Sequence, residues 1–298
     1  CISRQIWFGH QIPVWYCKNE VKKPCKPIVQ VNQPKSCPQC ASKKIEQDPD
    51  TLDTWFSSGL WTFSTLGWPA KSKDLDYFHP TSVLETGYDI LFFWVARMIL
   101  MTTYALNEIP FEKVYLHGLV RDKDGKKMSK SAGNGIDPLD MIAKFGTDAV
   151  RLSLVIGTSA GNDFRLYEEK IASYRNFVNK IWNSARFAFV NLPPDALLTK
   201  TGSTLKKSDL KTPADRWIVT KLQQLIKEVT SDMEHYNFSE AGTKIYDFTW
   251  SQYCDWYLEV SKGEHLNPPV LLYVLKNILK LLHPFTPFVT EALWTHLD

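Results

Sequence analysis

Residues 82–106, "SVLETGYDILFFWVARMILMTTYAL", decide the fold class of this chain. The first residues alternate as in a strand, a turn follows at Gly87, and the apolar run after it is typical of a buried helix. A second strand is predicted in "KVYLHGLV", residues 113–120. The order strand, turn, helix, strand indicates a parallel α/β sheet. Because such sheets bind ligands beyond the carboxyl ends of their strands, we expect a site near residues 85–89 and 117–118.

The composition is that of a globular chain with more than one domain. It has 298 residues, of which 44% are hydrophobic, enough for two or more cores. The net charge is only +3, so an anionic partner would meet local basic patches. We expect a soluble chain, because the most apolar run, residues 90–101, is interrupted by Arg97 and is shorter than the roughly 20 residues of a membrane span. The start at Cys1, without a leader, favours a piece of a longer polypeptide with no secretory signal.

An insertion rich in Lys, Pro, Gln and Asn occupies residues 17–47 and contains four cysteines. Cys37 and Cys40 have the two-residue gap that lets both thiolates reach one tetrahedral zinc ion, and Cys17 and Cys25 can supply the other two ligands. The gap between Cys17 and Cys25 is wider than in the usual pair of knuckles. Two interpretations stay open, a four-cysteine zinc site and a metal-free inserted loop.

After about residue 160 the apolar residues recur at three and four positions, which indicates helices. These stretches occupy residues 171–185, 218–229, 245–260 and 271–281. We therefore predict an α/β parallel sheet with a small inserted ribbon over residues 1–160, followed by an all-α helical bundle over residues 161–298.

Residues 122–134, "DKDGKKMSKSAGN", form a polar loop after the second predicted strand. The phosphate-binding pattern G-x-x-x-x-G-K-[ST] is absent from the chain. Lys127 and Lys130 can instead bring two ammonium groups, with the hydroxyls of Ser129 and Ser131, onto a polyphosphate. In nucleotidyl transfer such charges stabilise the negative charge that grows in the transition state. A solvated basic turn is the alternative that composition alone favours.

The string "KMSKS", residues 127–131, follows "HG" after eight residues and resembles the loop of that name in class I aminoacyl-tRNA synthetases. The rest of the chain resembles the valine-specific branch of this family through several segments. They are "CISRQIWFGHQIPVWYC", "DPDTLDTWFSSGLWTFSTLGWP", "FHPTSVLETGYDILFFWVARMI", "YRNFVNKIWNSARF", "PADRWIV" and "YDFTWSQYCDWYLE". The resemblance implies a Rossmann-type catalytic domain to about residue 160, then a helical anticodon-binding domain.

The resemblance also implies a reaction. Valine would attack ATP, with Mg²⁺, to give valyl-adenylate, and the valyl group would then pass to tRNA(Val). Lys127 and Lys130 would hold the departing pyrophosphate, and Met128 and Ser129 would shape the loop around the nucleotide. Ser131 would be a further ATP-binding residue of this loop. Such an enzyme is expected to be a cytoplasmic monomer.

The resemblance places the rest of the ATP at the two strand ends. Gly87 and Asp89 in "ETGYDI" fit the family's Gly-x-Asp at the adenylate ribose, where one carboxylate can accept from two hydroxyls. His117 and Gly118 fit the strand end beside the adenine. A carboxylate that caps the following helix is the alternative for Asp89.

For the amino acid, the resemblance implies an apolar pocket walled by Trp55, Ile90 and Trp94. Ile90 and Trp94 are four residues apart, so on an α-helix they would share one face. Ordinary core packing is the rival interpretation, above all for Trp94.

The sequence departs from the family pattern in several places. The family's His-x-Gly-His motif is absent, the editing domain is missing before "CISRQ", and Gly135 stands where a β-branched residue is expected. We therefore expect half an ATP site that does not catalyse adenylation alone. An isoleucine-specific ligase and an inactive tRNA-binding paralogue remain alternatives. Arg175, Lys180 and Arg186 on one predicted helix could face RNA or only solvent.

Overall fold

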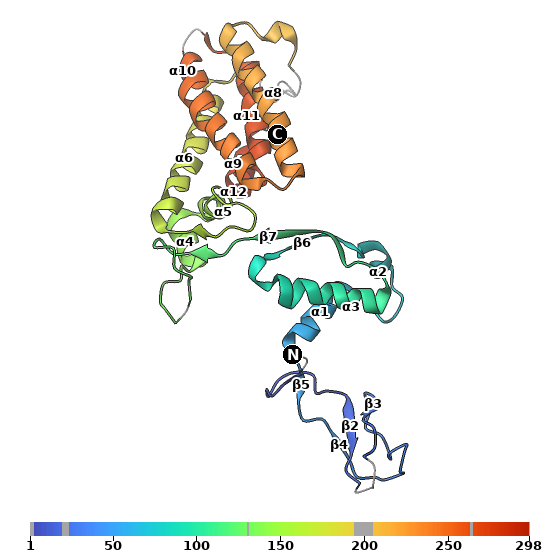
Figure 1. Cartoon of the computed structure of the whole chain (residues 1–298). Helices are drawn as coiled ribbons and strands as arrows, with labels where there is room; N and C mark the ends of the chain where they lie inside the picture. Colours follow the sequence, from blue (N-terminus) through green and yellow to red (C-terminus); the bar gives the residue numbers. More distant parts are fainter. Residues whose placement is uncertain (1–2, 20–23, 130, 194–204, 263–264, 298) are drawn as a thin grey trace. The chain divides into compact units, whose positions relative to one another are not determined.

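The computed structural model describes residues 3–19, 24–129, 131–193, 205–262 and 265–297. The chain forms two compact units, Cys1–Leu116 (unit 1) and His117–Asp298 (unit 2). Figure 1 shows short strands and helices in unit 1, and mainly helices in unit 2.

Unit 1 begins with an antiparallel ribbon. β1 (Ser3–Arg4) pairs with β5 (Thr51–Leu52), and β2 (Val14–Cys17) lies between β3 (Ile28–Val29) and β4 (Ile45–Gln47). β3 is short because it lies among four prolines between residues 24 and 38, which lack the N–H groups that a longer ladder needs. Trp15 of β2 is buried, and its Nε1 donates to the carbonyl of Gln30 at 2.9 Å. The predicted inserted ribbon is confirmed.

The rest of unit 1 consists of helices and two strands. α1 (Thr54–Ser64) and α2 (Lys73–Phe78) each begin after a capping side chain, Asp53 and Ser72. They are followed by β6 (Thr81–Gly87), the 3₁₀ turn η1 (Tyr88–Ile90), the π-helix η2 (Leu91–Val95), α3 (Ala96–Leu106) and β7 (Phe111–His117). The N–H of Thr81 donates to the carbonyl of Pro110 at 2.9 Å, so β6 and β7 begin at the same end and run parallel. The predicted order of strand, helix and strand is confirmed.

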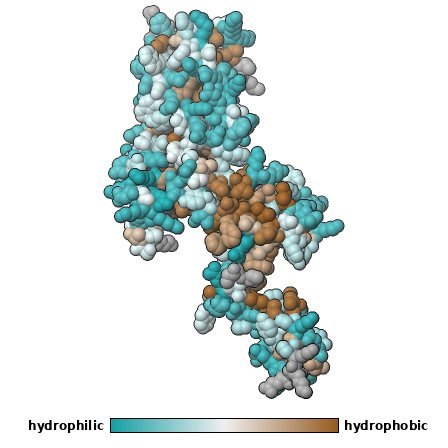
Figure 2. All heavy atoms as spheres, in the orientation of Figure 1, coloured by the Kyte–Doolittle hydropathy of each residue, from teal (hydrophilic) through white to brown (hydrophobic). Residues whose placement is uncertain are grey.

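The helix after Gly87 was predicted to be buried, and this prediction is wrong. Phe92, Leu100 and Tyr104 are 74%, 70% and 93% exposed, and only one edge packs inward, through Val95 and Met98. Figure 2 shows hydrophobic side chains gathered over this part of unit 1. Periodicity could not reveal this exposure, because burial depends on which other elements cover the helix.

The same helix corrects the expectation about membrane spans. By length and composition alone, Tyr88–Leu106 is apolar enough to cross a membrane, with a mean hydropathy of 1.4 and 17% of the segment buried. Arg97 interrupts the run but does not lower its mean hydropathy below that of a span.

Unit 2 begins with a second pair of parallel strands. β8 (Val120–Arg121) pairs with β9 (Phe164–Arg165), and α4 (Pro138–Phe145) and α5 (Thr147–Val155) lie between them in the chain. A small core of Met141, Val150 and Ile171 joins these helices to the long helix that follows. Among the described residues, the parallel sheet is therefore present as two separate two-stranded pieces, β6–β7 and β8–β9.

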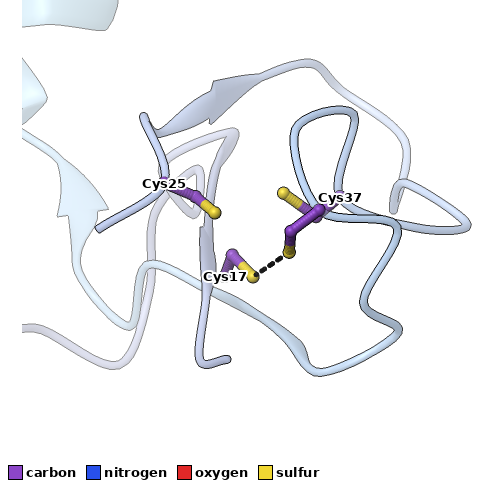
Figure 3. Close-up of side chains that lie close together, drawn as sticks. Cys17, Cys25 and Cys37 are labelled. Atoms are coloured by element: carbon purple, nitrogen blue, oxygen red, sulfur yellow. Dashed lines mark hydrogen bonds between the residues drawn. The ribbon is translucent and has the colours of Figure 1, made fainter. Parts of the chain in front are cut away.

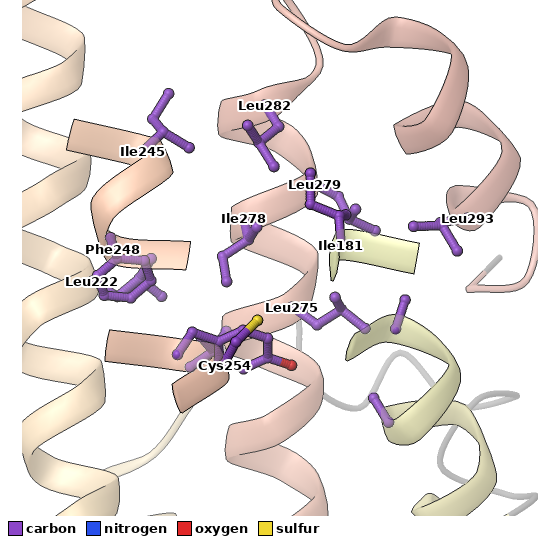
Figure 4. Close-up of a cluster of buried hydrophobic side chains, with 14 of the residues drawn as sticks. Ile181, Leu222, Ile245, Phe248, Cys254, Leu275, Ile278, Leu279, Leu282 and Leu293 are labelled. Atoms are coloured by element: carbon purple, nitrogen blue, oxygen red, sulfur yellow. The ribbon is translucent and has the colours of Figure 1, made fainter. Parts of the chain in front are cut away.

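The remainder of unit 2 is a helical bundle, as predicted. Its elements are α6 (Glu168–Asn191), η3 (Lys207–Asp209), α8 (Pro213–Glu234), α9 (Phe238–Asp247), the π-helix η4 (Phe248–Tyr257), α10 (Leu258–Val260), α11 (Pro268–Leu282) and α12 (Pro287–Trp294). α8, α11 and α12 begin with proline. Proline is favoured there because the N–H that it lacks would have no acceptor within the first turn of a helix. Ile181, Leu222, Ile245 and Leu275 meet in the core (Figure 4).

The compact units divide between residues 116 and 117, whereas the sequence predicts a domain boundary near residue 160. The structural reason is that Leu152 of α5 and Ile156, which directly follows α5, belong to the core of the bundle. α5 and the elements that pack on it therefore belong to the same compact unit as the helical bundle. The predicted boundary near residue 160 between a catalytic and a helical domain stays a prediction.

Candidate functional site

The basic loop leaves β8 through a tight turn. The N–H of Asp122 donates to the carbonyl of Lys126, and Gly125 occupies the left-handed region with φ of 81°. The Asp122 carboxylate accepts from the N–H groups of Asp124 and Lys126, at 3.0 and 2.8 Å. The sequence "DKDGKK" thus forms a turn for a physical reason, since aspartate and glycine are the residues that such turns require.

Asn134 ties the two sides of this loop together. Its Nδ2 donates to the Asp122 carboxylate at 2.8 Å and to the carbonyl of Lys127 at 3.2 Å, and its Oδ1 accepts from the N–H of Ser129 at 3.0 Å. These donated bonds, with the Asn134 amide first and the Lys126 N–H next, lower the pKa of Asp122 below its usual value. Sequence reasoning did not single out Asn134 or Asp122, because their pairing depends on how the loop folds back.

The predicted phosphate-binding residues have the exposure that the role requires. Lys127 is exposed and has no ion-pair partner in the part of the chain that the structure describes. Met128 is half-buried and packs against the small core of α4 and α5, and this contact anchors the loop. The hydroxyls of Ser129 and Ser131 lie 3.3 Å apart. Lys130 lies outside the described residues.

The strand end at His117 and Gly118 is closely packed against the chain around Asn162. A Cβ on Gly118 would lie 1.7 Å from the carbonyl oxygen of Asn162, closer than any real contact. Next to it, the N–H of Leu119 donates to the Asp163 carboxylate at 2.8 Å, and Arg121 forms an ion pair with the same carboxylate. His117 is exposed, with Nδ1 2.8 Å from the carbonyl of Gly118. Only glycine fits at position 118.

In unit 1, Gly87 and Asp89 lie at the carboxyl end of β6, as predicted. Gly87 is buried and is the residue from which η1 begins, whereas Asp89 is exposed within η1. Because Gly87 occupies the N-cap position without a side-chain bond, Asp89 is not the capping acid of this turn. Its carboxylate makes no hydrogen bond or ion pair with the residues that the structure describes, and so can accept from a ligand.

Trp55, Ile90 and Trp94 come from α1, η1 and η2. Trp55 stacks on Phe93 with ring centroids 6.0 Å apart, whereas Trp94 donates from Nε1 to the carbonyl of Ser58 at 2.9 Å. The two indoles are thus held by different partners. The four-residue spacing of Ile90 and Trp94 assumed an α-helix, but η2 is a π-helix, which has more residues per turn. Single-turn π segments are frequent at functional sites.

The four cysteines of the insertion converge, as the zinc interpretation requires. The sulfur atoms of Cys17, Cys25, Cys37 and Cys40 all lie within 4.8 Å of one another. Figure 3 shows the thiols of Cys17, Cys25 and Cys37 turned toward a common centre. Tetrahedral zinc with Zn–S bonds of about 2.3 Å places its sulfur ligands roughly 3.8 Å apart, so the arrangement fits. The long gap after Cys17 does not prevent convergence.

The knuckle from Cys37 to Cys40 is built by local hydrogen bonds. The N–H of Ala41 donates to the carbonyl of Cys37, and the N–H of Cys37 donates to the carbonyl of Ser42, both at 2.8 Å. A hydrogen bond from the Ser42 N–H lowers the pKa of Cys40 to about 7, whereas burial raises the pKa of Cys25 to about 12. With this pKa, Cys40 is accessible as a thiolate, the form that binds metal, near neutral pH.

Of the three basic residues singled out on α6, two have partners inside unit 2. Lys180 donates to Asp255 at 2.7 Å, and the guanidinium of Arg175 lies 5.9 Å from the ring centroid of Phe145. Arg186 is exposed and lines a cavity with Trp182.

Comparison with known proteins gives two family matches. Residues 1–167 match the family described as tRNA synthetases class I (I, L, M and V), and residues 215–298 match the anticodon-binding domain of tRNA ligase. Similar curated proteins include the valine–tRNA ligases of Clostridium tetani and Dehalococcoides mccartyi, each 51% identical over 100% of this chain. The chain spans about a third of their length, 34% and 33%.

Solved structures of similar fold include two synthetases. The LeuRS of Agrobacterium radiobacter K84, in a ternary complex with tRNA and LeuAMS, matches with a TM-score of 0.80 and 25% identity, over 100% of this chain and 40% of that chain. The methionyl-tRNA synthetase of Mycobacterium tuberculosis, in complex with methionyl-adenylate, matches with a TM-score of 0.63. Its identity is 22%, over 84% of this chain and 50% of that one, so this likeness concerns the fold alone.

Proposed function

The chain belongs to the class I tRNA synthetases, and on that premise we propose that it is part of a valine–tRNA ligase. The reaction is the ATP-dependent activation of valine to valyl-adenylate, followed by transfer to tRNA(Val). Residues 1–160 are the second half of the catalytic domain, and residues 161–298 are the helical anticodon-binding domain. The observation that carries the choice of valine is the 51% identity, along the whole chain, to ligases named for valine.

The basic loop acts on the phosphates of ATP. Lys127 and Lys130 hold the β and γ phosphates as pyrophosphate leaves, with Mg²⁺ as the accompanying cation. The ammonium of Lys127 is exposed and forms no ion pair with the residues that the structure describes, which supports this role, because no such pair has to break when a phosphate binds. Ser129 and Ser131 offer hydroxyl donors beside it. Met128 packs against the small core and so anchors the loop next to Lys127 before the substrate binds.

The nucleoside binds at the strand ends. Asp89 accepts from the two ribose hydroxyls, and the buried backbone of Gly87 lets the ligand come close. His117 and Gly118 lie beside the adenine. The exposure of Asp89, and its lack of a capping bond in η1, support this assignment.

The valine side chain is bounded by Trp55, Ile90 and Trp94. Trp94 is held by Ser58 and is half-buried, which gives a rigid wall, and Ile90 limits the length of the side chain. An isoleucine-specific ligase is the alternative, and it would need a pocket with room for one more methylene.

The cysteine ribbon binds a structural zinc ion through Cys17, Cys25, Cys37 and Cys40. A zinc ion with four protein ligands has no open position, so its role is to hold the ribbon and not to act on substrate. The ribbon has little core of its own beyond Trp15 and Cys37, and a small domain of this kind needs such a crosslink.

Activity requires more protein than these residues. The exposed apolar side chains of η2 and α3 are of the kind that a completed catalytic domain would cover, and no His-x-Gly-His motif is present in the sequence. We propose that the full-length ligase is as long as these relatives and is a cytoplasmic monomer. Its remaining two thirds supply the elements that cover these apolar side chains and the His-x-Gly-His motif.

The test is ATP–pyrophosphate exchange with valine, isoleucine and threonine, on this chain and on the full-length gene product. Exchange that depends on valine in the full-length protein, and its absence from the 298-residue chain, is the expected result. Exchange that prefers isoleucine would replace valine by the alternative. No exchange in either protein would leave a tRNA-binding paralogue.

A further inference from the structure

Three short extended segments lie side by side in unit 2, where the basic loop leaves β8. β8 and β9 pair in parallel with Arg121 opposite Arg165, and Arg121 also forms an antiparallel backbone bridge with Lys127. The backbone of Arg121 therefore lies between Arg165 on one side and Lys127 on the other. The position of Lys127 depends on how Arg121 is held.

The side chain of Arg121 is held by Asp163, the residue directly before β9. One carboxylate oxygen, Oδ2, accepts from Nε of Arg121 and also contacts its Nη2, and the other oxygen, Oδ1, accepts from the N–H of Leu119 at 2.8 Å. The side chains of Arg121 and Asp163 are only 33% and 20% exposed. Because the pair is partly shielded from water, salt screens it less than it screens a surface pair.

The network extends in both directions from this ion pair. Nη1 of Arg121 donates to the carbonyl of Gly125 at 3.3 Å, in the turn just before Lys127. At the other end, Leu119 directly follows Gly118, the strand end proposed to lie beside the adenine. The hydrogen bonds thus connect the two ends of the proposed nucleotide site within unit 2.

An ion pair that only fastens β8 to β9 is the simpler interpretation. The two strands are already joined by backbone hydrogen bonds, from the N–H of Phe164 to the carbonyl of Leu119 at 3.1 Å and from the N–H of Leu166 to the carbonyl of Arg121 at 2.9 Å. The bond from Arg121 to Gly125 lies outside this ladder. It holds the turn of the loop, which strand pairing does not require.

Arg165 shows that a positive charge beside this turn does not by itself make such a link. Its guanidinium lies 3.3 to 3.6 Å from the position of a Cβ on Gly125. It makes no hydrogen bond or ion pair with the residues that the structure describes. Arg165 and Arg121 therefore carry the same charge next to the same turn, and they differ in whether a carboxylate holds the guanidinium.

We propose that Asp163 and Arg121 are positioning residues for the activation of valine. They fix the turn before Lys127 relative to the strand end, so that a nucleotide bound at the strand end presents its phosphates to the Lys127 ammonium. A charge that is held in place before the reaction stabilises the transition state most effectively, and a displacement of about 1 Å can cost on the order of 10²-fold in rate. The inference rests on the proposed function and concerns residues that act through Lys127.

The first test is valine-dependent ATP–pyrophosphate exchange by the full-length protein, with the ATP concentration varied. Asp163→Asn keeps an oxygen for the Leu119 N–H but removes the negative charge that holds Arg121. It should lower the rate at saturating ATP by about 10- to 100-fold and change the KM for ATP little. Arg121→Gln should have the same effect. Arg165→Gln is the matched control and should stay within about 2-fold of wild type.

The variants are then combined with Lys127→Ala. If Asp163 acts through Lys127, Asp163→Asn should lower the rate of the Lys127→Ala protein by no more than about 2-fold further. A pair that only fastens the strands would lower the rate by the same factor in both backgrounds. That result, an unchanged rate in Asp163→Asn, or an equal loss in Arg165→Gln would overturn the inference.

A second measurement does not depend on the reaction. Deuterium uptake by peptides that cover loop residues 122–129 of the full-length protein should rise in Asp163→Asn and Arg121→Gln and not in Arg165→Gln; unchanged uptake in all three would also overturn the inference. If wild type shows no exchange with valine, the proposed function fails, and the uptake still decides whether the pair positions the loop. If calorimetry shows Asp163→Asn to be unfolded, Arg121→Gln, which leaves the bond from Leu119 to Asp163 in place, decides.

Discussion

Replacing Gly118 by alanine tests the close approach of two chain segments at the proposed adenine end of the site. The added Cβ would lie 1.7 Å from the carbonyl oxygen of Asn162 and 2.6 Å from the N of Asp163. Since C···O contacts begin at about 3.3 Å, the two segments would have to separate by roughly 1.6 Å. Both partners are backbone, so no side chain can turn aside to make room.

That separation has a cost that can be estimated. Overpacking typically costs about 1–3 kcal/mol where side chains can adjust. The shift would also pull the Leu119 N–H from the Asp163 carboxylate, a bond to a charged group of the kind that contributes about 1.5–3 kcal/mol. We expect a loss of about 3 kcal/mol or more, which lowers the Tm of a unit of this size by about 6–12 °C.

The assay is thermal unfolding by calorimetry, combined with hydrogen exchange at the Leu119 amide. Gly135→Ala is the matched control, because a Cβ there has nothing within 4 Å and no left-handed φ to oppose it. It should leave the Tm unchanged or raise it slightly. If Gly118→Ala melted within about 1 °C of wild type, with the Leu119 amide still protected, the argument from close approach would be refuted.

Three further predictions concern the loop and the ribbon. Lys127→Ala in the full-length protein should lower the rate of valine-dependent pyrophosphate exchange by about 10²- to 10³-fold, the usual effect of removing a donor to a developing charge. The control Lys123→Ala removes an exposed lysine of the same turn and should change the rate little. Equal losses in the two variants would mean that only the total charge of the loop matters. Asn134 donates to Asp122 and lowers the pKa of its carboxyl group. The ionised carboxylate therefore stabilises the folded loop at any pH above the unfolded pKa of about 3.9, and this stabilisation is lost as the pH falls through the lower pKa of the folded state. Exchange of the Lys126 amide, followed by NMR from pH 6 to pH 2, should show this loosening in wild type and not in Asp122→Asn; identical profiles would count against it. Cys37→Ser should abolish zinc bound at one ion per chain, measured by mass spectrometry of the metal, whereas Cys254→Ala in the bundle core should retain it; a wild-type chain that takes up no zinc would reject the site.

The features that sequence predicted are those whose cause is local. The strand before Gly87, the knuckle from Cys37 to Cys40 and the turn at Gly125 each follow from residues within a few positions of one another. The helical bundle followed from periodicity, because its apolar stripes do face one core.

The features that sequence missed depend on pairs far apart in the chain. Gly118 meets Asn162, and Asn134 meets Asp122, only after the intervening segments have folded. The exposure of the helix after Gly87 was missed because an apolar pattern shows what can be buried and not what covers it. The only sequence signals of these two contacts were Gly118 and Asn134 themselves. Single residues of this kind form no periodic pattern, so the sequence does not reveal their partners.

The corner between α5 and α12 explains why the basic loop folds with the bundle and not with unit 1. The buried Asp148 carboxylate accepts from the N–H groups of Phe288 and Val289, at 3.3 and 2.7 Å. Arg151, on the same helix, donates to the carbonyls of Pro284 and Phe285.

These bonds cap the first turn of α12 and the turn before it, so α5 cannot shift without opening the bundle. α5 also packs with α4 on the small core that holds Met128. The loop proposed to bind ATP and the helical bundle therefore belong to one folded unit.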